Sequence, residues 1–323
     1  MKNIVLLGAG YWGVNVIRNL KKFKGLNIFF VEPDHSKWSK IEDKSNLFPN
    51  LSELLEYVDV DAALVCTPVS THYPLVKQLL NHGIHTLCQK PLVTSVKEAE
   101  ELTTLAKEKN VKLATSFTYC FHPAIHRMSG LTDNGVLGNL LYYDSTRINL
   151  GIIQRDTNVL WDLLCHDAAI LLHLTKKMPK FASCVGECHN KNGFADVANV
   201  SFGYENGFTA HVHVNWISPV KNRQIILAGN KKMVVFDDCG NEKLKIYDSG
   251  YAQNGDVFDY RTGDITIPKI ENQEAVYLEI KHFLDCLEND TDPLTNGEFS
   301  IKVLKMIEAA NKSMERCGEP VSL

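Results

Sequence analysis

The sequence predicts an α/β protein in two parts: a doubly wound parallel sheet, and then an α+β region with an open, mostly antiparallel sheet. The first prediction rests on residues 1–118, where apolar runs and helical patterns alternate without exception. The second rests on residues 119–323, where strand patterns follow one another across short turns. We therefore expect two domains, 1–118 and 119–323, with room for a C-terminal helix to pack back on the first.

The chain opens with a strand, a glycine-rich turn and a helix. Ile4–Leu7 is a short apolar run, typical of a strand that is buried on both faces. Gly8, Gly10 and Gly13 follow in the spacing G-x-G-x-x-G, ahead of apolar residues at helical spacing. The first glycine allows a tight turn, the second lets the backbone approach a pyrophosphate, and the third allows close helix packing. The unpaired N–H groups and the dipole at a helix start also favour a phosphate.

A second apolar run, Ile28–Val31, ends in Glu32, nineteen residues after Gly13. A carboxylate there can accept hydrogen bonds from both ribose hydroxyls of NAD and would repel the additional phosphate of NADP. Asp34 supports this preference, whereas Lys37 weakens it because a cation nearby could meet a 2′-phosphate. Strand, glycine triplet, helix, strand and acid in register predict a Rossmann domain that binds NAD.

The rest of the first part continues the alternation. Helix patterns cover 36–44 and 51–57, and the apolar strand 62–66 then ends at Thr67 and Pro68. Because Pro68 cannot donate a hydrogen bond, the strand stops there and a turn opens at its carboxyl end, where doubly wound sheets bind ligands. The remaining predictions are a helix over 71–80 with His72 in its first turn, a strand over 84–88, a helix over 96–109 capped by Ser95, and a strand over 111–116.

The second part is dominated by strands. The sequence predicts helices over 123–132, 159–174, 274–288 and 299–316, strands over 139–149, 181–187, 197–204, 208–216, 224–228 and 232–236, and a loop over 251–268. In the strand 208–216, valines and Trp216 alternate with His211, His213 and Asn215, which predicts that both faces of this strand are covered.

Composition excludes several classes of function. Lys and Arg number 34 against 38 Asp and Glu, and no basic run occurs, so we expect no nucleic-acid partner. No apolar stretch approaches about 20 residues, so we expect no membrane span. The N-terminus enters a strand directly, which leaves no room for a signal peptide, and the nine cysteines show no spacing typical of a disulfide framework. Both observations favour a cytoplasmic setting. We expect no metal site. The one cluster of candidate ligands does not have the sequence spacing of known zinc sites: Cys184, Cys188, His189, His211 and His213.

Three residues are candidates for chemistry. Lys90 follows a strand of the first sheet, where a desolvated lysine beside the positive nicotinamide would have a lowered pKa and could accept a substrate proton. The alternative is a surface lysine that closes a strand. Asp162 and His166 are four residues apart, so they share one face of a helix, and the carboxylate could orient the imidazole. Their alternative is a helix N-terminal acid and a half-buried histidine.

Four motifs carry a family resemblance: GAGYWG at 8–13, CTPVSTH at 66–72, QKP at 89–91 and D-x-x-x-H at 162–166. Together they resemble the Gfo/Idh/MocA family of sugar and polyol oxidoreductases, over essentially the full length. The resemblance implies a substrate pocket between the nicotinamide and the open sheet. It maps the lysine of the family's E-K-P motif onto Lys90, and the family's aspartate and histidine onto Asp162 and His166. Gln89 departs from the usual glutamate, which removes a charge beside Lys90.

The complete set of expected site residues follows from these motifs and positions. The expected NAD contacts are Gly8, Gly10, Tyr11, Trp12, Gly13, Glu32, Thr67, Pro68, His72, Gln89, Lys90 and Trp161. The expected substrate contacts are Lys90, Tyr119, Arg155, Asn158, Asp162 and His166, with Lys90, Asp162 and His166 as the catalytic residues. For Asn158 the alternative is that it only caps the helix that follows. Whether Lys90 or His166 is the base stays open.

Within the family, the segments VLWDLLCHD, VNWISPVKNRQIILAGNKKMVVFDD, EKLKIYDSG and YRTGDITIP are most similar to bacterial dehydrogenases that oxidise the 3-hydroxyl of UDP-linked N-acetylglucosamine or its uronic acid. This resemblance implies a 3-keto product that an aminotransferase converts to a 3-amino sugar for lipid A or surface polysaccharide. It also implies a homotetramer, or a dimer, with open sheets face to face. The alternatives are the uronate, which Arg155 or Arg223 could bind, another nucleotide sugar, and a non-catalytic NAD-binding sensor.

Overall fold

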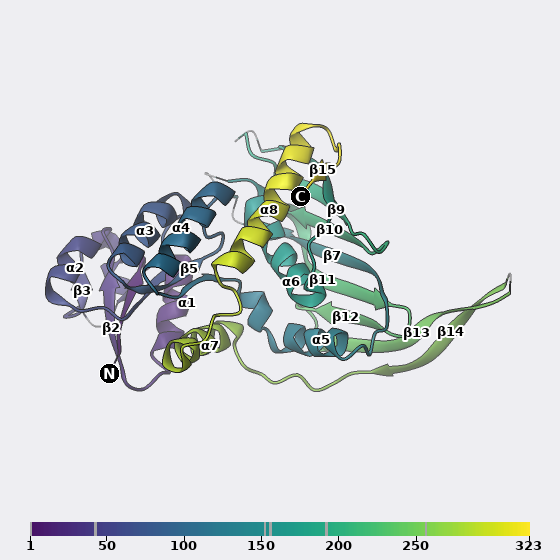
Figure 1. Ribbon diagram of the computed structural model, residues 1–323, viewed down its shortest axis with the longest axis horizontal. Coiled ribbons are helices and arrows are strands. Elements are labelled where there is room, and N and C mark those ends of the chain that lie inside the picture. The colour runs from purple at the N-terminus through teal and green to yellow at the C-terminus, as the bar shows by residue number, and fades with distance from the viewer. Residues whose placement is uncertain (1, 42–43, 152, 155–156, 191–192, 256) are drawn as a thin grey trace. The chain divides into compact units, whose positions relative to one another are not determined.

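The computed structural model describes residues 2–41, 44–151, 153, 154, 157–190, 193–255 and 257–323 (Figure 1). Its contacts divide the chain into two compact units. Unit 1 comprises Met1–Thr118 and Glu274–Leu304, and unit 2 comprises Tyr119–Gln273 and Lys305–Leu323. The segment 274–304 therefore belongs with the N-terminal residues, although it follows most of unit 2 in the sequence.

Unit 1 is a six-stranded parallel sheet with the order β3-β2-β1-β4-β5-β6, which confirms the predicted doubly wound fold. Its strands are β1 (Lys2–Leu7), β2 (Leu26–Val31), β3 (Leu47–Phe48), β4 (Ala62–Val65), β5 (His85–Gln89) and β6 (Leu113–Ser116). Its helices are α1 (Tyr11–Leu20), α2 (Leu51–Tyr57), α3 (His72–Asn81), α4 (Val96–Glu108) and α7 (Ala275–Asn289), with 3₁₀ turns η1 (His35–Lys40) and η2 (Val69–Thr71). The strand order reverses between β1 and β4, so the carboxyl ends of these two strands flank the point where such sheets bind ligands.

Both faces of this sheet are buried, as the apolar runs of its strands predict. Ile4 and Leu6 of β1 share one core cluster with residues of α1 and α7, whereas the intervening Val5 and Leu7 are buried on the opposite face. From α7, Ile280, Phe283 and Leu284 enter the same cluster. Burying each of these three side chains stabilises the unit by roughly 1.5–3 kcal/mol, so α7 is an integral part of it.

Local signals explain most boundaries in unit 1. The Ser95 hydroxyl accepts a hydrogen bond from the backbone N–H of Glu98, which confirms the predicted cap of α4. The predicted helix over 36–44 is wrong. Residues 36–40 form part of the short 3₁₀ turn η1, which begins where Asp34 accepts a hydrogen bond from the Ser36 N–H and which contains no buried residue. A polar segment without an apolar face gains nothing from packing, so an α-helix is not stabilised there.

Unit 2 is built on an open nine-stranded sheet with the order β14-β13-β12-β11-β7-β10-β9-β8-β15. Its strands are β7 (Leu140–Leu150), β8 (Phe181–Glu187), β9 (Val197–Gly203), β10 (Thr209–Asn215), β11 (Ile217–Gly229), β12 (Met233–Asp237), β13 (Leu244–Asn254), β14 (Val257–Thr266) and β15 (Val321–Ser322). The pair β7–β10 is parallel and the other described pairs are antiparallel, as the sequence predicts for a mostly antiparallel sheet.

Helices cover one face of the sheet of unit 2. The 3₁₀ turn η3 (Thr118–Phe121) leads into α5 (Pro123–Asp133), and a π turn, η4 (Leu160–Leu164), runs into α6 (Cys165–Thr175). The last helix, α8 (Gly297–Glu315), begins in unit 1 and ends in unit 2. In β10, Val212 and Val214 are buried whereas His211 is exposed. Within one chain, therefore, only one face of this strand is fully covered, and coverage of the other face by a second copy of the chain stays a prediction.

The predicted loop over 251–268 is wrong. Most of this range belongs to the antiparallel hairpin of β13 and β14, in which Tyr251 pairs with Tyr260. Figure 1 shows that the hairpin extends well past the other strands of its sheet. Tyr260 is 94% exposed and Ile265 is 55% exposed, so no buried face imposes the alternation of apolar and polar residues by which a strand is recognised. Leu244 and Ile246 at the start of β13 are buried, but the exposed part of the hairpin is defined mainly by backbone pairing.

No helix within the described ranges is long and apolar enough to cross a membrane.

Candidate functional site

The glycine turn of unit 1 is shaped for a phosphate. Gly8 has φ +92°, and a Cβ there would lie 2.8 Å from the Cys66 carbonyl oxygen. A Cβ on Gly13 would lie 2.2 Å from the Gly8 carbonyl oxygen, so Gly13 is required by the packing of α1 on the turn, and Gly8 by its positive φ and by the backbone that follows β4. A Cβ on Gly10 would meet nothing within 4 Å. Gly10 is also the N-cap of α1, and no side chain of the described residues caps this helix. The second glycine thus leaves open space beside free N–H groups, which fits the pyrophosphate of NAD.

Glu32, the predicted ribose contact, is 2% exposed at the carboxyl end of β2. Its Oε2 accepts a hydrogen bond of 2.7 Å from the Ala9 N–H, and its Oε1 accepts one of 3.0 Å from the Asp34 N–H. The carboxylate therefore ties the glycine turn to the second strand and retains a lone pair on each oxygen. Lys37 Nζ lies 3.3 Å from Asp34 Oδ2 and 3.8 Å from Glu32 Oε1. Because two carboxylates surround it, this lysine offers little charge to a 2′-phosphate.

The two aromatic residues after Gly10 differ in exposure. Tyr11 is 78% exposed, so its ring is accessible to a bound nucleotide. Trp12 packs against the apolar core that α1 and α7 share, and its Nε1 is a buried donor that makes no hydrogen bond in the described part of the chain.

His72 joins the turns that follow β4 and β5. It is 1% exposed; its Nε2 lies 3.0 Å from the Thr67 carbonyl oxygen, and its Nδ1 lies 3.0 Å from the Pro91 carbonyl oxygen. Thr71 Oγ1 donates to the Pro68 carbonyl oxygen at 2.7 Å and braces the first of these turns. Both ring nitrogens of His72 thus face protein carbonyls, and any contact with a cofactor would use its carbon atoms.

Lys90 follows directly after β5 and is half-buried. The preceding Gln89 donates from Nε2 to the Ser116 hydroxyl at 2.9 Å, which links the ends of β5 and β6. Because all strands of this sheet are parallel, the turns after β1, β4, β5 and β6 lie along one edge. The structure of unit 1 therefore brings the glycine turn, Thr67 and Lys90 to the same edge, where the sequence places them.

In unit 2, Asn158 caps the helical run that carries Asp162. Its Oδ1 accepts hydrogen bonds from the N–H groups of Leu160 (3.1 Å) and Trp161 (3.3 Å), and its Nδ2 donates to Asn311 at 2.7 Å. The capping role that the sequence left as an alternative is therefore present. Trp161, a predicted NAD contact, is 9% exposed. Arg155 lies outside the described residues.

Asp162 and His166 lie in consecutive but different helical segments. Asp162 belongs to the π turn η4, and its Oδ2 accepts a hydrogen bond of 2.9 Å from Trp216 Nε1 at the end of β10. His166 belongs to α6, and its ring meets the Tyr119 ring edge-on, with centroids 5.3 Å apart. The sequence predicts Asp162 and His166 one turn apart on a regular α-helix. Their relative positions differ from that prediction, because a π turn is wider than an α turn. Tyr119, a predicted substrate contact, is brought beside the predicted catalytic histidine.

A buried ion pair lies beneath this tyrosine, and sequence reasoning missed it. Arg147 is 3% exposed and Asp167 is 0% exposed; Nε of the arginine donates to Oδ2 of the aspartate at 2.6 Å. The Ser145 hydroxyl also donates to Asp167, at 2.5 Å. The guanidinium carbon of Arg147 lies 4.4 Å from the centre of the Tyr119 ring, a cation–π geometry. Ser145 and Arg147 alternate on the buried face of β7, and this polar period-2 pattern is the signal that could have indicated the pair.

A second pair of charges holds the other end of Tyr119. Its hydroxyl donates to Asp238 Oδ2 at 2.8 Å and accepts from Arg223 Nη1 at 3.0 Å. Burial raises the pKa of the Tyr119 hydroxyl, so it stays protonated and donating. Burial by itself raises the pKa of Asp238, but the hydrogen bond from Tyr119 and the charge of Arg223 outweigh it and hold that pKa below its ordinary value. The ring beside His166 is therefore fixed at both ends.

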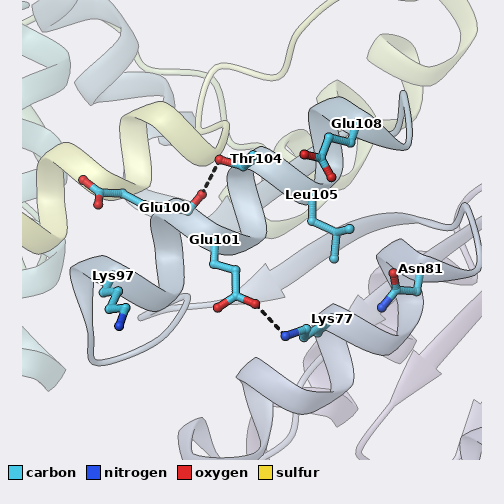
Figure 2. A pocket seen from close by; sticks show the side chains of 8 residues that line it. All are labelled: Lys77, Asn81, Lys97, Glu100, Glu101, Thr104, Leu105 and Glu108. Carbon is cyan, nitrogen blue, oxygen red and sulfur yellow. Dashed lines mark hydrogen bonds and ion pairs between the residues drawn. The ribbon is translucent and has the colours of Figure 1, made fainter.

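Two other surface features carry no comparable chemistry. Figure 2 shows a hollow between α3 and α4 in which the ammonium group of Lys77 bonds Glu101 at 2.5 Å. It is lined by the side chains Lys77, Asn81, Lys97, Glu100, Glu101, Thr104, Leu105 and Glu108.

The cluster of cysteines and histidines that was considered as a metal site includes His189. Nδ1 of His189 lies 2.7 Å from the buried Asp196. Across the residues that the structure describes, no three His, Cys, Asp or Glu gather as metal ligands.

Two models of one family match the chain. One describes the oxidoreductase family Gfo/Idh/MocA with an NAD-binding Rossmann fold, and it matches residues 2–117. The other describes the C-terminal domain of the same family, and it matches residues 125–235.

Individual proteins agree with the family models. The UDP-N-acetylglucosamine 3-dehydrogenase of Acidithiobacillus ferrooxidans is 26% identical over 81% of this chain and 81% of its own length. Its solved structure superposes with a TM-score of 0.81 at 22% identity over 98% of both chains. An oxidoreductase from Agrobacterium radiobacter, solved in complex with NAD⁺, L-tartaric acid and magnesium, superposes with a TM-score of 0.84 at 18% identity, over 99% of this chain and 98% of that one.

The geometry and the matches agree on the first domain. The glycine turn, the open space at Gly10 and the buried Glu32 are the parts of a dinucleotide site, and the family model that covers them is that of an NAD-binding domain. The second family model covers residues 125–235 of unit 2, which include the strands β7 to β11 and the helical segments that carry Asp162 and His166. The chain therefore belongs to the Gfo/Idh/MocA family of NAD-dependent oxidoreductases.

Proposed function

We propose that this oxidoreductase oxidises the 3-hydroxyl of a UDP-linked N-acetyl amino sugar, UDP-N-acetylglucosamine, to a 3-keto sugar. The observation that carries the choice of substrate is the relative of that name, which matches 81% of the chain at 26% identity. The structure supports an alcohol oxidation because each unit offers what that chemistry needs. Unit 1 has a dinucleotide edge with Lys90 on it, and unit 2 has an imidazole held by an ordered aromatic ring.

The proposed reaction removes a hydride and a proton from one carbinol group. NAD, when bound by the glycine turn and Glu32, supplies the acceptor for the hydride from the third carbon of the sugar. Lys90 or His166 accepts the hydroxyl proton, and Asp162 orients the histidine. Trp216 fixes Asp162 through its indole N–H, and Tyr119 limits the rotation of the His166 ring. Holding the base in one orientation lowers the entropy cost of the proton transfer.

A uronic acid form of the same sugar is the second candidate, and Arg223 favours it. This guanidinium reaches the Tyr119 hydroxyl, and its Nε makes no hydrogen bond within the described residues. The Arg223 side chain is 31% exposed, and a planar guanidinium is suited to a sugar carboxylate. Asp238 lies 3.4 Å from Arg223 and offsets part of this charge, which is why we place the uronate second.

The assay is mass spectrometry of the purified protein with NAD, a panel of UDP-sugars and a hydroxylamine trap for the ketone. We expect an oxime from UDP-N-acetylglucosamine, lost in Lys90→Ala and in His166→Asn. Lys97→Ala is the matched control, because this lysine lies on the outer helix α4 and should leave turnover unchanged. Oxime only from the uronate, lost in Arg223→Met, would move the assignment to the second candidate. Turnover retained in both Lys90→Ala and His166→Asn would contradict the proposed proton acceptors.

We also propose that the chain forms a homotetramer, or a dimer, through the open sheet of unit 2. Leu150, Val185 and Val220 support this, because these apolar side chains of its strands are 60–78% exposed in the single chain. Light scattering coupled to gel filtration tests the assembly, and Val185→Lys should weaken it. A 3-keto sugar is a substrate for an aminotransferase, so the proposed partner in the cell is an enzyme of that class in a surface-polysaccharide or lipid A pathway.

A further inference from the structure

A buried carboxyl group, Glu279, lies behind the edge of the sheet in unit 1. It belongs to α7, is 3% exposed, and takes no part in the motifs by which the family is recognised. Its Oε2 accepts hydrogen bonds from the Ser116 hydroxyl at 2.7 Å and from the Thr118 hydroxyl at 3.2 Å. Its Oε1 is buried and makes no hydrogen bond within the described residues. An acid in such a place is unusual, because burial without full pairing is costly.

A continuous hydrogen-bond chain connects this carboxyl group to the segment of Lys90. Gln89 donates from Nε2 to the Ser116 hydroxyl at 2.9 Å, and Ser116 in turn donates to Glu279. Ser116 has a single proton, so its direction of donation is set by the amide on one side and the carboxyl on the other. Gln89 immediately precedes Lys90. Glu279 is thus two hydrogen bonds away from the residue that begins the turn of the proposed catalytic lysine.

The surroundings of Glu279 contain no compensating charge in the described part of the chain. The groups that act on it are the Ser116 and Thr118 hydroxyls, and the Cys66 thiol lies close enough to be influenced by it. Burial raises the pKa of the Cys66 thiol, so this neighbour is neutral. Burial also raises the pKa of Glu279 to about 8, and the two hydroxyl donors only partly oppose that effect. The carboxyl group is therefore protonated at neutral pH and becomes charged in the mildly alkaline range.

The departure from the family's E-K-P motif fits this arrangement. With glutamine at position 89, the chain of donors runs in one direction and every link is satisfied. A glutamate at position 89 would compete with Glu279 for the single proton of Ser116, and two carboxyl groups sharing one hydroxyl cannot both ionise easily. The amide at 89 and the acid at 279 are chemically matched to each other.

We propose that Glu279 is a positioning residue, which acts through Ser116 and Gln89 to set the orientation of the Lys90 turn and the charge behind it. This inference rests on the proposed function, because it takes Lys90 as a group that handles the substrate proton. When Glu279 ionises, its hydrogen bonds to Ser116 and Thr118 strengthen.

The test compares three variants with the wild-type enzyme from pH 6 to pH 9.5: Glu279→Gln, Gln89→Glu, and the double variant that exchanges the two side chains. In Glu279→Gln an amide oxygen can still accept the hydrogen bond from Ser116, but residue 279 no longer has a proton to lose. The inflection of kcat/KM near pH 8 should therefore disappear. Gln89→Glu should lower kcat by about tenfold to a hundredfold with a smaller effect on KM, as misplacement of a reacting group does. In the exchanged variant the chain reverses its direction and is satisfied again, so kcat should recover.

Glu274→Gln is the matched control. This glutamate immediately precedes α7, but it is paired with Arg18 and Lys22, and the hydrogen bonds from Arg18 and then Lys22 lower its pKa to about 2. Its substitution should leave the alkaline part of the pH profile unchanged. A purely structural role for Glu279 predicts that all variants differ only in stability, with parallel pH profiles.

A readout without substrate separates this inference from the proposed function. With ¹³C-labelled glutamate side chains, the carboxyl resonance that disappears in Glu279→Gln should titrate near pH 8, and Gln89→Glu should shift its midpoint upward. NAD affinity measured over the same pH range should change at that midpoint in the wild type and not in Glu279→Gln. A carboxyl group that titrates near 4.5, or an exchanged variant no more active than Gln89→Glu alone, would overturn the inference. If no sugar reacts, the proposed function is contradicted. The titration of the Glu279 carboxyl resonance would still test the inference about the buried acid.

Discussion

The glycine turn allows a prediction in which packing and cofactor binding are separated by one pair of variants. In Gly13→Ala the added methyl group would lie 2.2 Å from the Gly8 carbonyl oxygen and 3.1 Å from its carbonyl carbon, both of them backbone atoms. Neither atom can rotate away, so α1 must move off β1. Overpacking of this kind costs about 1–3 kcal/mol. Replacing a helical glycine by alanine returns about 1 kcal/mol, so from the upper end of that range we expect a net loss of about 2 kcal/mol.

Gly10→Ala is the matched partner, because its methyl group meets no protein atom within 4 Å. The free energy of unfolding should stay within about 0.5 kcal/mol of the wild type, as for an ordinary surface change. The methyl group would occupy the space where the pyrophosphate approaches the backbone, so NAD affinity should fall by at least about tenfold, or about 1.4 kcal/mol. Both variants should therefore lose NAD affinity, and only Gly13→Ala should lose stability.

Urea unfolding followed by circular dichroism gives the first quantity, and calorimetric titration with NAD gives the second. The slope of the unfolding transition must be the same in all three proteins for the comparison of midpoints to hold. Wild-type NAD affinity in Gly10→Ala would refute the assignment of the open space to the pyrophosphate. Wild-type stability in Gly13→Ala would refute the argument from packing.

Three further predictions concern carboxyl groups and their partners. Because the pKa of Glu279 is about 8 in the folded protein against an ordinary value of 4.5, the folded state keeps a proton that the unfolded chain has lost between these values. The free energy of unfolding should thus fall as pH rises from about 4.5 to 8, by on the order of 5 kcal/mol, and Glu279→Gln should flatten this dependence in urea titrations at pH 5, 7 and 9. Asp167→Ala leaves the buried guanidinium of Arg147 unpaired and should cost about 3–5 kcal/mol in the same assay; a loss below about 1 kcal/mol would contradict the pairing. Trp216→Phe removes the N–H that fixes Asp162, so kcat should fall while NAD affinity, measured by calorimetry, stays at the wild-type value.

Most elements of unit 1 could be predicted from the sequence because short-range rules decide them; the exceptions are the helix predicted over 36–44 and the short strand β3. Apolar runs mark strands that are buried on both faces, and the helix over 51–57 and the cap at Ser95 lie where they were predicted. The glycine turn and Glu32 were recognisable because their spacing is dictated by the ligand. The hairpin of β13 and β14 was missed, since exposed strands have no buried face to leave a pattern.

The charged groups of the candidate site were less predictable, for a physical reason. Arg147, Asp167 and Glu279 are buried, and a buried charge is tolerated only where a particular partner meets it. Arg147 finds Asp167 at a separation of 20 residues, and Glu279 finds Ser116 at a separation of 163. Such pairs are properties of the folded chain: the alternation of Ser145 and Arg147 in β7 could have indicated a buried polar group, but not the partner that it meets. Lys90, Asp162 and His166 could be proposed from the sequence only because motifs mark them, and their roles stay predictions.

The return of α7 to the N-terminal sheet has a consequence for how the protein is made. The core of unit 1 is incomplete without Ile280, Phe283 and Leu284, which leave the ribosome only after nearly nine tenths of the 323 residues have been synthesised. The first 118 residues must therefore wait, with one face of their sheet only partly covered by α1, while strands β7 to β14 of the second sheet are translated. Unit 2 also includes Lys305–Leu323, so neither unit can complete its core until the last part of the chain has been made. Newly made N-terminal segments are accordingly expected to be substrates for chaperones.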